Sequence, residues 1–147
     1  MKNSTQILAG LGGALVLNLV HEFARHGVRD APHVQEIAEQ GIDKIVDKAG
    51  LPKPEGNTRY GIALAGDIVA NTVYYAQVGY GKNGWTRGIA LGLIGGIGAV
   101  LLPEKLGFDD RPVSKTTTTK ILTIVWYTLG GITAAALNHA LRREATA

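Results

Sequence analysis

Two polar stripes interrupt apolar stretches of the sequence, and their residue types could bind a cation or carry a proton. In the stretch ILAGLGGALVLNLVHEFARH, four polar residues share one helical face at spacings i, i+3, i+4 and i+7: Asn18, His21, Glu22 and Arg25. A second face carries Asp67, Asn71 and Tyr74 at i, i+4 and i+7. Carboxylates and imidazoles at membrane depth are the usual parts of ion sites and proton relays, because an ionisable group in hydrocarbon is costly to keep.

The two stripes are predicted to meet as one inner polar cluster. A rise of 1.5 Å per residue places His21 about 7 Å, Asn18 about 12 Å and Asp67 about 10 Å below the membrane surface. The last apolar stretch brings Trp126 and Tyr127 to a comparable depth. We predict that an ion or solute binds, or a proton is relayed, at Asn18, His21, Glu22, Arg25, Asp67, Asn71 and Tyr74.

Two other interpretations of the cluster remain open. Arg25 could pair with Glu22 or Asp67, and His21 could hydrogen-bond Asn71, in which case the network would only fix helix packing. Alternatively His21, Glu22 and Asp67 are ligands of a divalent metal, or acid and base groups, in a membrane enzyme that acts on a lipid or lipophilic substrate. No residue is assigned a catalytic role.

Two specific cofactor arrangements are disfavoured. The zinc-protease pattern HExxH fails because Arg25 stands where its second histidine would be. His139 lies about 30 Å along the last apolar stretch, so His21 and His139 are too far apart to ligate one haem or one metal.

Composition excludes several classes of function. The 147 residues are about one domain's worth, and charged residues are only 18% against 46% hydrophobic. The absence of cysteine excludes disulfides, thiolate metal sites and cysteine nucleophiles. A net charge of +3 is too modest to indicate a nucleic-acid-binding surface, and no phosphate loop or GxSxG motif is present.

Four apolar stretches, about 5–26, 60–80, 85–102 and 120–141, are each close to the ~20 residues that cross a bilayer as a helix. They predict a single all-α integral-membrane domain over 1–147 with four transmembrane helices. Tyr60, Tyr80 and Trp85 lie at stretch ends, as interface anchors do. The mean hydropathy of +0.10 leaves a soluble bundle with an apolar cavity as the alternative.

A fifth helix is predicted at about 31–49, between the first two spans. Its apolar positions recur at helical spacing from Val34 to Ala49, opposite a polar face. Asp30 and Pro32 mark its start, and Gly50 with Pro52 marks its end. We expect this amphipathic helix to lie on the membrane surface, where it caps the bundle, gates the site or docks a partner.

Glycine is abundant inside the apolar stretches, with 20 residues in all. In the third stretch Gly88, Gly92 and Gly96 are spaced by four and form one stripe, which lets another helix backbone approach closely. The sequence does not tell whether that helix belongs to the same chain or to a second copy. We expect a homo-oligomer associated through such stripes.

The distribution of Lys and Arg predicts an orientation. Five lie on the side of the termini and the short 79–84 turn: Lys2, Lys82, Arg87, Arg142 and Arg143. Ten lie on the other side: Arg25, Arg29, Lys44, Lys48, Lys53, Arg59, Lys105, Arg111, Lys115 and Lys120. The positive-inside rule then places loops 27–59 and 103–119 in the cytoplasm and both termini outside the plasma (inner) membrane.

The sequence therefore predicts a small multi-pass membrane protein, in contact with the lipid bilayer, that conducts or exchanges a small ion, proton or solute. A membrane-embedded enzyme is the first alternative. A scaffolding protein, whose polar cluster only fixes helix packing, is the second.

Overall fold

A computed structural model describes residues 2–79 and 83–144, and every regular element in them is helical. The elements are α1 (Lys2–Gly27), α2 (Val34–Ala49), α3 (Gly56–Ala76), the 3-10 turn η1 (Gln77–Gly79), α4 (Gly84–Lys105), α5 (Arg111–Ser114) and α6 (Thr117–Glu144). The predicted all-α class is confirmed. Predictions that rest on Tyr80, Lys82 and the side chain of Lys2 lie outside what the structure describes.

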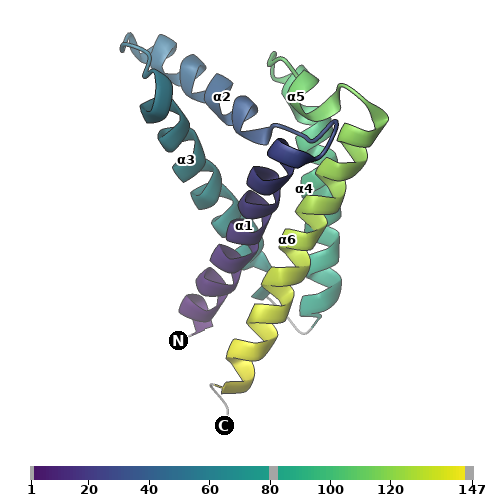
Figure 1. Cartoon of the computed structure of the whole chain (residues 1–147). Coiled ribbons are helices and arrows are strands. Elements are labelled where there is room, and N and C mark those ends of the chain that lie inside the picture. Colours follow the sequence, from purple (N-terminus) through teal and green to yellow (C-terminus); the bar gives the residue numbers. More distant parts are fainter. Residues whose placement is uncertain (1, 80–82, 145–147) are drawn as a thin grey trace.

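The four long helices run alternately up and down (Figure 1). Both termini and η1 lie at one end of the bundle, which we call the terminal end. The helices α2 and α5 lie at the opposite end, which we call the α2 end. The largest interface joins α4 to α6, and α1 packs against both α6 and α3.

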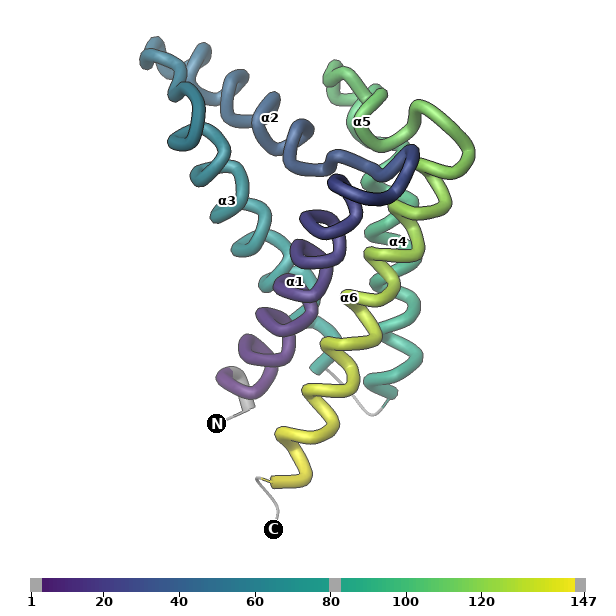
Figure 2. Tube along the Cα trace, viewed as in Figure 1, coloured from purple at the N-terminus to yellow at the C-terminus, as the bar shows by residue number. Residues whose placement is uncertain are grey.

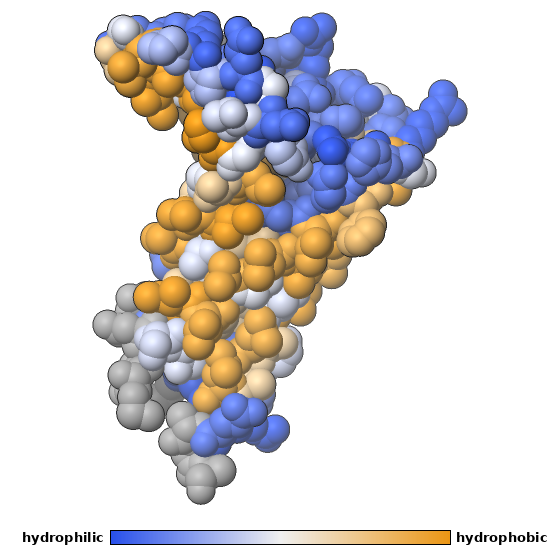
Figure 3. All heavy atoms as spheres, turned by 60° about the vertical axis from the view of Figure 1, so that its left-hand side comes forward, coloured by the Kyte–Doolittle hydropathy of each residue, from blue (hydrophilic) through white to orange (hydrophobic). Residues whose placement is uncertain are grey.

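Three helices are long and apolar enough to cross a membrane: Ser4–Gly27 in α1, Gly84–Lys105 in α4 and Thr117–Glu144 in α6. The helix α3 is not among them, so the predicted fourth span is not confirmed by length and composition. On the face shown in Figure 3, hydrophobic residues fill the middle of the molecule, and hydrophilic residues cover most of the α2 end. These features are those of an integral membrane protein.

The predicted glycine stripe lies in the α4–α6 interface. A Cβ atom added at Gly96 would come 2.6 Å from Ile124 Cα, and one added at Gly88 would collide with the carbonyl oxygen of Gly131. The absence of side chains therefore lets the two backbones touch. The stripe contacts a helix of the same chain, so the expected homo-oligomer would have to use another surface.

Several predicted helix boundaries are wrong by a few residues. The helix α2 begins at Val34 rather than at 31, because Asp30 adopts a positive φ of 59° and Pro32 follows it. Gly50 ends α2, as predicted, and it adopts the left-handed conformation there. The helix α4 continues beyond the predicted end at 102, through Pro103 to Lys105.

The last helix begins before the predicted 120, since four consecutive threonines at 116–119 lead into it and α6 starts at Thr117. Thr116 caps this helix, because its Oγ1 accepts a hydrogen bond from the backbone N–H of Thr119 at 3.0 Å. Thr119 is buried, and its hydroxyl donates to the carbonyl oxygen of Asp30 at 3.0 Å.

Polar contacts fix α2 across the end of the bundle. On one side, Arg59 of α3 forms ion pairs of 3.1 Å with Glu39 and 2.6 Å with Asp43. On the other side, Lys44 Nζ donates to the carbonyl oxygen of Leu106, beyond the end of α4, at 2.6 Å. The helix α2 therefore bridges α3 and α4, which hardly touch each other at that end (Figure 2).

We expect Arg59→Gln to lower the free energy of unfolding by about 0.5–2 kcal/mol, because it removes two ion pairs that are each worth up to ~1 kcal/mol. Chemical unfolding in mixed micelles measures this. The control is Lys53→Gln, which removes one ion pair to Asp47 between side chains that are 50% and 58% exposed. An equal effect of the two substitutions would contradict the bridging role of Arg59.

Candidate functional site

The two polar stripes meet between α1 and α3. Asn18 Nδ2 lies 2.9 Å from Asp67 Oδ2 and also 2.9 Å from the carbonyl oxygen of Ala14, so the amide donates to both. Asn71, one turn further along α3, donates to the backbone oxygen of Asp67 at 3.0 Å. Asn18 and Asp67, which were predicted to lie at similar depths, therefore form a direct hydrogen bond.

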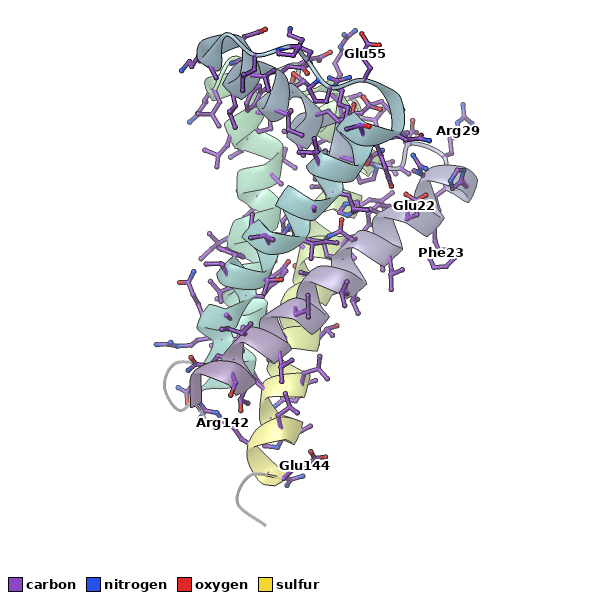
Figure 4. The ribbon with its side chains drawn as sticks, turned by 90° about the vertical axis from the view of Figure 1, so that its left-hand side faces the viewer. Glu22, Phe23, Arg29, Glu55, Arg142 and Glu144 are labelled. Atoms are coloured by element: carbon purple, nitrogen blue, oxygen red, sulfur yellow. The ribbon has the colours of Figure 1, made fainter. Side chains whose placement is uncertain are left out.

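A second polar group lies nearer the α2 end. Arg25 Nη2 lies 2.8 Å from Glu22 Oε1, and Tyr60 Oη donates to Glu22 Oε2 at 3.0 Å. The Arg25 guanidinium also lies 5.7 Å from the centre of the Tyr60 ring. Of the two partners predicted for Arg25, it takes Glu22 and not Asp67. Figure 4 shows Glu22 towards the α2 end of α1, while its neighbour Phe23 points away from the bundle.

Two predicted members of the cluster, His21 and Tyr74, make their side-chain contacts with α6 and α4. His21 is buried, and its ring packs edge-on against α6, with ring centres 4.9 Å from Trp126 and 6.2 Å from Tyr127. Tyr74 Oη donates to the carbonyl oxygen of Leu91 in α4 at 2.8 Å. The aromatic residues of α6 thus lie at the predicted depth, but they contact His21 rather than the carboxylates.

Within the described residues, no three His, Asp or Glu side chains are placed so that they could hold a metal ion together. Among the candidate ligands, His21 contacts Trp126, Glu22 contacts Arg25, and Asp67 contacts Asn18.

His139 packs at the terminal end, with its ring centre 6.4 Å from that of Trp85. His21 and His139 therefore lie towards opposite ends of α6, as the sequence predicts.

A cavity of about 180 Å³ between α1 and α3 has a partly polar lining, and we call it the polar cavity. Its polar side chains are Asn18, His21, Glu22, Gln35, Tyr60 and Asp67. A depression of about 570 Å³ at the α2 end shares Gln35 and Tyr60 with it. Gln35 and Tyr60 therefore lie between the polar cavity, which Asp67 also lines, and the depression at the surface of the α2 end.

The rim of this depression carries an ion pair between Asp109 and Arg111. Asp109 belongs to its lining, and hydrogen bonds from Arg111 lower the pKa of that carboxyl to about 2. Asp109 is therefore ionised across the physiological pH range. Its backbone N–H and carbonyl both bond the side chain of Gln40, which ties the rim to α2.

A larger cavity of about 430 Å³ lies between α3 and α4 beneath α2, and we call it the apolar cavity. Most of its lining is hydrophobic, with Asp67, Tyr74 and Tyr127 as its polar side chains. Ile94 and Leu102 border it and are 63% and 53% exposed, so its mouth lies on the surface that faces lipid in a membrane. Asp67 lines both cavities.

Both cavities lie where α3 diverges from the bundle, because its backbone packs closely against the other helices only towards the terminal end. There Tyr75 is fully buried, and its hydroxyl donates to the carbonyl oxygen of Tyr127 in α6 at 2.7 Å. A Cβ atom added at Gly10 of α1 would lie 2.7 Å from the backbone nitrogen of Ala76. Close packing therefore fills the space on the terminal side of Asp67, and α3 diverges from α4 only towards the α2 end (Figures 1 and 2).

The sequence assigned Tyr60 to interface anchoring alone, and that interpretation is incomplete, since Tyr60 joins the Glu22 group. Its spacing could have revealed this, because Tyr60 precedes Asp67 by seven residues and so shares the face of the second stripe. The contribution of Gln35 from α2 carried no comparable signal.

Comparison of the chain with models of protein families, with curated proteins and with solved structures finds no match. We therefore infer a function from the geometry around Asp67.

Proposed function

We propose that this integral membrane protein exchanges a proton for a cation at Asp67. One observation carries the proposal: Asp67 is a carboxylate that lines both a cavity with partly polar walls and a cavity that faces lipid. In the part of the chain that the structure describes, no Lys or Arg forms an ion pair with Asp67. Without a permanent countercharge, its negative charge is compensated by a proton or by a bound cation.

We further propose that α3 crosses the membrane, which gives four spans. The chain order supports this, because α1 ends at the α2 end whereas α4 begins at the terminal end. If α1 and α4 both cross the membrane in the same direction, the segment between them has to cross back. The helix α3, with 21 residues, is long enough to do so, since ~20 residues suffice.

The excess of Lys and Arg favours a cytoplasmic α2 end in the plasma (inner) membrane, with both termini outside. Exposed apolar side chains support an interfacial position for the outer part of α2. Ile45 is 69% exposed there, beside Leu51 and Ile62 of the following segments. A homo-oligomer remains part of the proposal and would use helix faces other than the α4 glycine stripe.

The proposed exchange uses few groups. Asn18 holds one oxygen of the Asp67 carboxylate, which fixes its position between the cavities. Glu22, which is ion-paired with Arg25 and accepts a hydrogen bond from Tyr60, lines the polar cavity and would provide hydrogen-bonding groups between Asp67 and the cytoplasmic surface. Binding of a cation to Asp67 displaces its proton into the polar cavity, and protonation releases the cation.

Proton-coupled flux in reconstituted vesicles tests the proposal. Vesicles with an acidic interior and a trapped pH dye receive Na⁺, K⁺, tetramethylammonium, ethidium or tetraphenylphosphonium from outside. We expect at least one cation to discharge the pH gradient faster than it does in protein-free vesicles. If none of the five does so at any protein density, proton–cation exchange by this protein is wrong.

A membrane enzyme that acts on a lipophilic substrate is the second candidate, and the opening of the apolar cavity towards lipid favours it. Asp67 would then serve as an acid or base. This alternative predicts that wild-type protein, but not Asp67→Asn, changes the mass spectrum of a total lipid extract in which it is incubated.

A further inference from the structure

We propose that the cation exchanged at Asp67 is a lipophilic organic cation that enters the apolar cavity sideways from the membrane. This inference rests on the proposed exchange at Asp67 and names its substrate class. The observation behind it is the composition of the cavity, in which one carboxylate faces a hydrophobic lining.

The lining disfavours a bare inorganic ion. A small metal cation that leaves water needs several oxygen ligands to replace its hydration shell. Apart from Asp67, the side-chain oxygens in the lining are the phenols of Tyr74 and Tyr127, and the Tyr74 hydroxyl already donates to Leu91. A cation that carries its charge inside apolar groups needs no such shell, and it gains from contact with the hydrophobic wall.

Aromatic side chains also suit an organic cation. Tyr74 and Tyr127 line the apolar cavity on either side of Gly95, where an added Cβ would lie 3.1 Å from a ring carbon of each. An organic cation next to these rings gains cation–π attraction of about 0.5–2 kcal/mol. The rings and the carboxylate would thus contact the same ligand.

Size and access agree with this class of ligand. The volume of about 430 Å³ is within the range of roughly 300–1,000 Å³ found for pockets that hold small organic molecules. The residues around the mouth, Ile94, Leu102 and Leu106, are exposed and hydrophobic. A ligand dissolved in the bilayer therefore reaches Asp67 without crossing a polar surface.

Binding of radiolabelled tetraphenylphosphonium to the purified full chain in detergent micelles tests the inference, with protein-free micelles as the blank. Two competitors separate its two requirements. Tetramethylammonium has the charge without the apolar body, and triphenylphosphine oxide has an aromatic body without the charge. We expect each competitor to displace the label at least tenfold more weakly than unlabelled tetraphenylphosphonium does. We also expect Asp67→Asn to lower the affinity of the protein for tetraphenylphosphonium at least tenfold.

A second variant tests the position of the ligand. A Cβ atom added at Gly98 meets only Leu102 Cδ1, at 3.5 Å, so Gly98→Leu should fit the fold while filling the cavity. We expect at least a tenfold loss of affinity, and a smaller loss for Gly98→Ala. The matched control is Gly61→Leu, at a helical glycine with open space around it, which should bind as wild type does. Thermal midpoints of all variants verify folding.

The outcomes separate this inference from the proposed function. Equal binding of triphenylphosphine oxide, or wild-type affinity in Asp67→Asn, would overturn the inference in favour of a merely apolar site. If Na⁺ or K⁺ discharges the pH gradient but tetraphenylphosphonium does not bind, the proposed substrate class is wrong and proton–cation exchange is supported. Tetraphenylphosphonium binding that depends on Asp67, with no cation discharging the gradient, would support the ligand class and refute the exchange.

Discussion

Asp67→Asn is expected to reduce protein-dependent discharge of a pH gradient to the rate of protein-free vesicles. The substitution preserves the shape of the side chain and its ability to hydrogen-bond Asn18, but it removes the group that binds a proton or a cation. The measurement is the flux experiment with the pH dye, using whichever cation the wild type transports. Folding is checked by the thermal midpoint, which should stay close to that of the wild type.

Two further variants make this result interpretable. Asp47→Asn, on the exposed part of α2, should transport as wild type does. Glu22→Gln should slow exchange severalfold without abolishing it, because Glu22 lines the polar cavity but not the apolar cavity. If Asp67→Asn transports normally and only its thermal midpoint changes, the polar cluster fixes helix packing and the protein is a scaffold.

Gly131→Leu is expected to destabilise the bundle by about 3 kcal/mol or more, at or above the upper end of the typical cost of overpacking. A Cβ atom at position 131 would lie within 3.1 Å of three backbone atoms of Gly88 and Gly92. Backbone atoms cannot rotate away as side chains do, so α4 and α6 would have to separate. Size-exclusion chromatography and thermal unfolding in detergent should show loss of the folded, monodisperse protein.

Gly131→Ala tests the same contact with the smallest side chain, and it should already lower the thermal midpoint by several degrees. The control is Gly66→Leu on α3, where an added Cβ meets nothing within 4 Å. The opposite result would be equal thermal midpoints for Gly131→Ala and Gly66→Leu, at or above the wild-type value. It would show that the two backbones can separate with little loss of stability.

The contact between Asn18 and Asp67 was predictable because helix rise is constant. Counting residues from the span ends placed both side chains at similar depths. Their spacing from neighbouring polar residues placed each of them on the polar face of its helix. The same arithmetic could not place His21 or Tyr74, because depth does not determine which neighbouring helix a face meets. His21 turned to α6 and Tyr74 to α4.

The cavities could not be predicted, because they depend on contacts between residues far apart in sequence. The divergence of α3 depends on the close approach of Gly10 to Ala76 and on the bond from Tyr75 to Tyr127. The position of α2 depends on Arg59 and Lys44. None of these pairings has a fixed spacing in the sequence, and no periodic pattern encodes them.

The uneven attachment of α3 gives it the mechanics of a lever. Its pivot is the backbone contact of Gly10 with the Thr72–Ala76 turn, and its far end, which only side-chain contacts attach, lies about 20 Å away along the helix at Arg59. A rotation of a few degrees at the pivot moves Arg59 by an ångström or more and widens or narrows the space next to Asp67. Since Arg59 is ion-paired to α2, the same rotation would also pull on α2 at the α2 end, so that the openings of both cavities would change together.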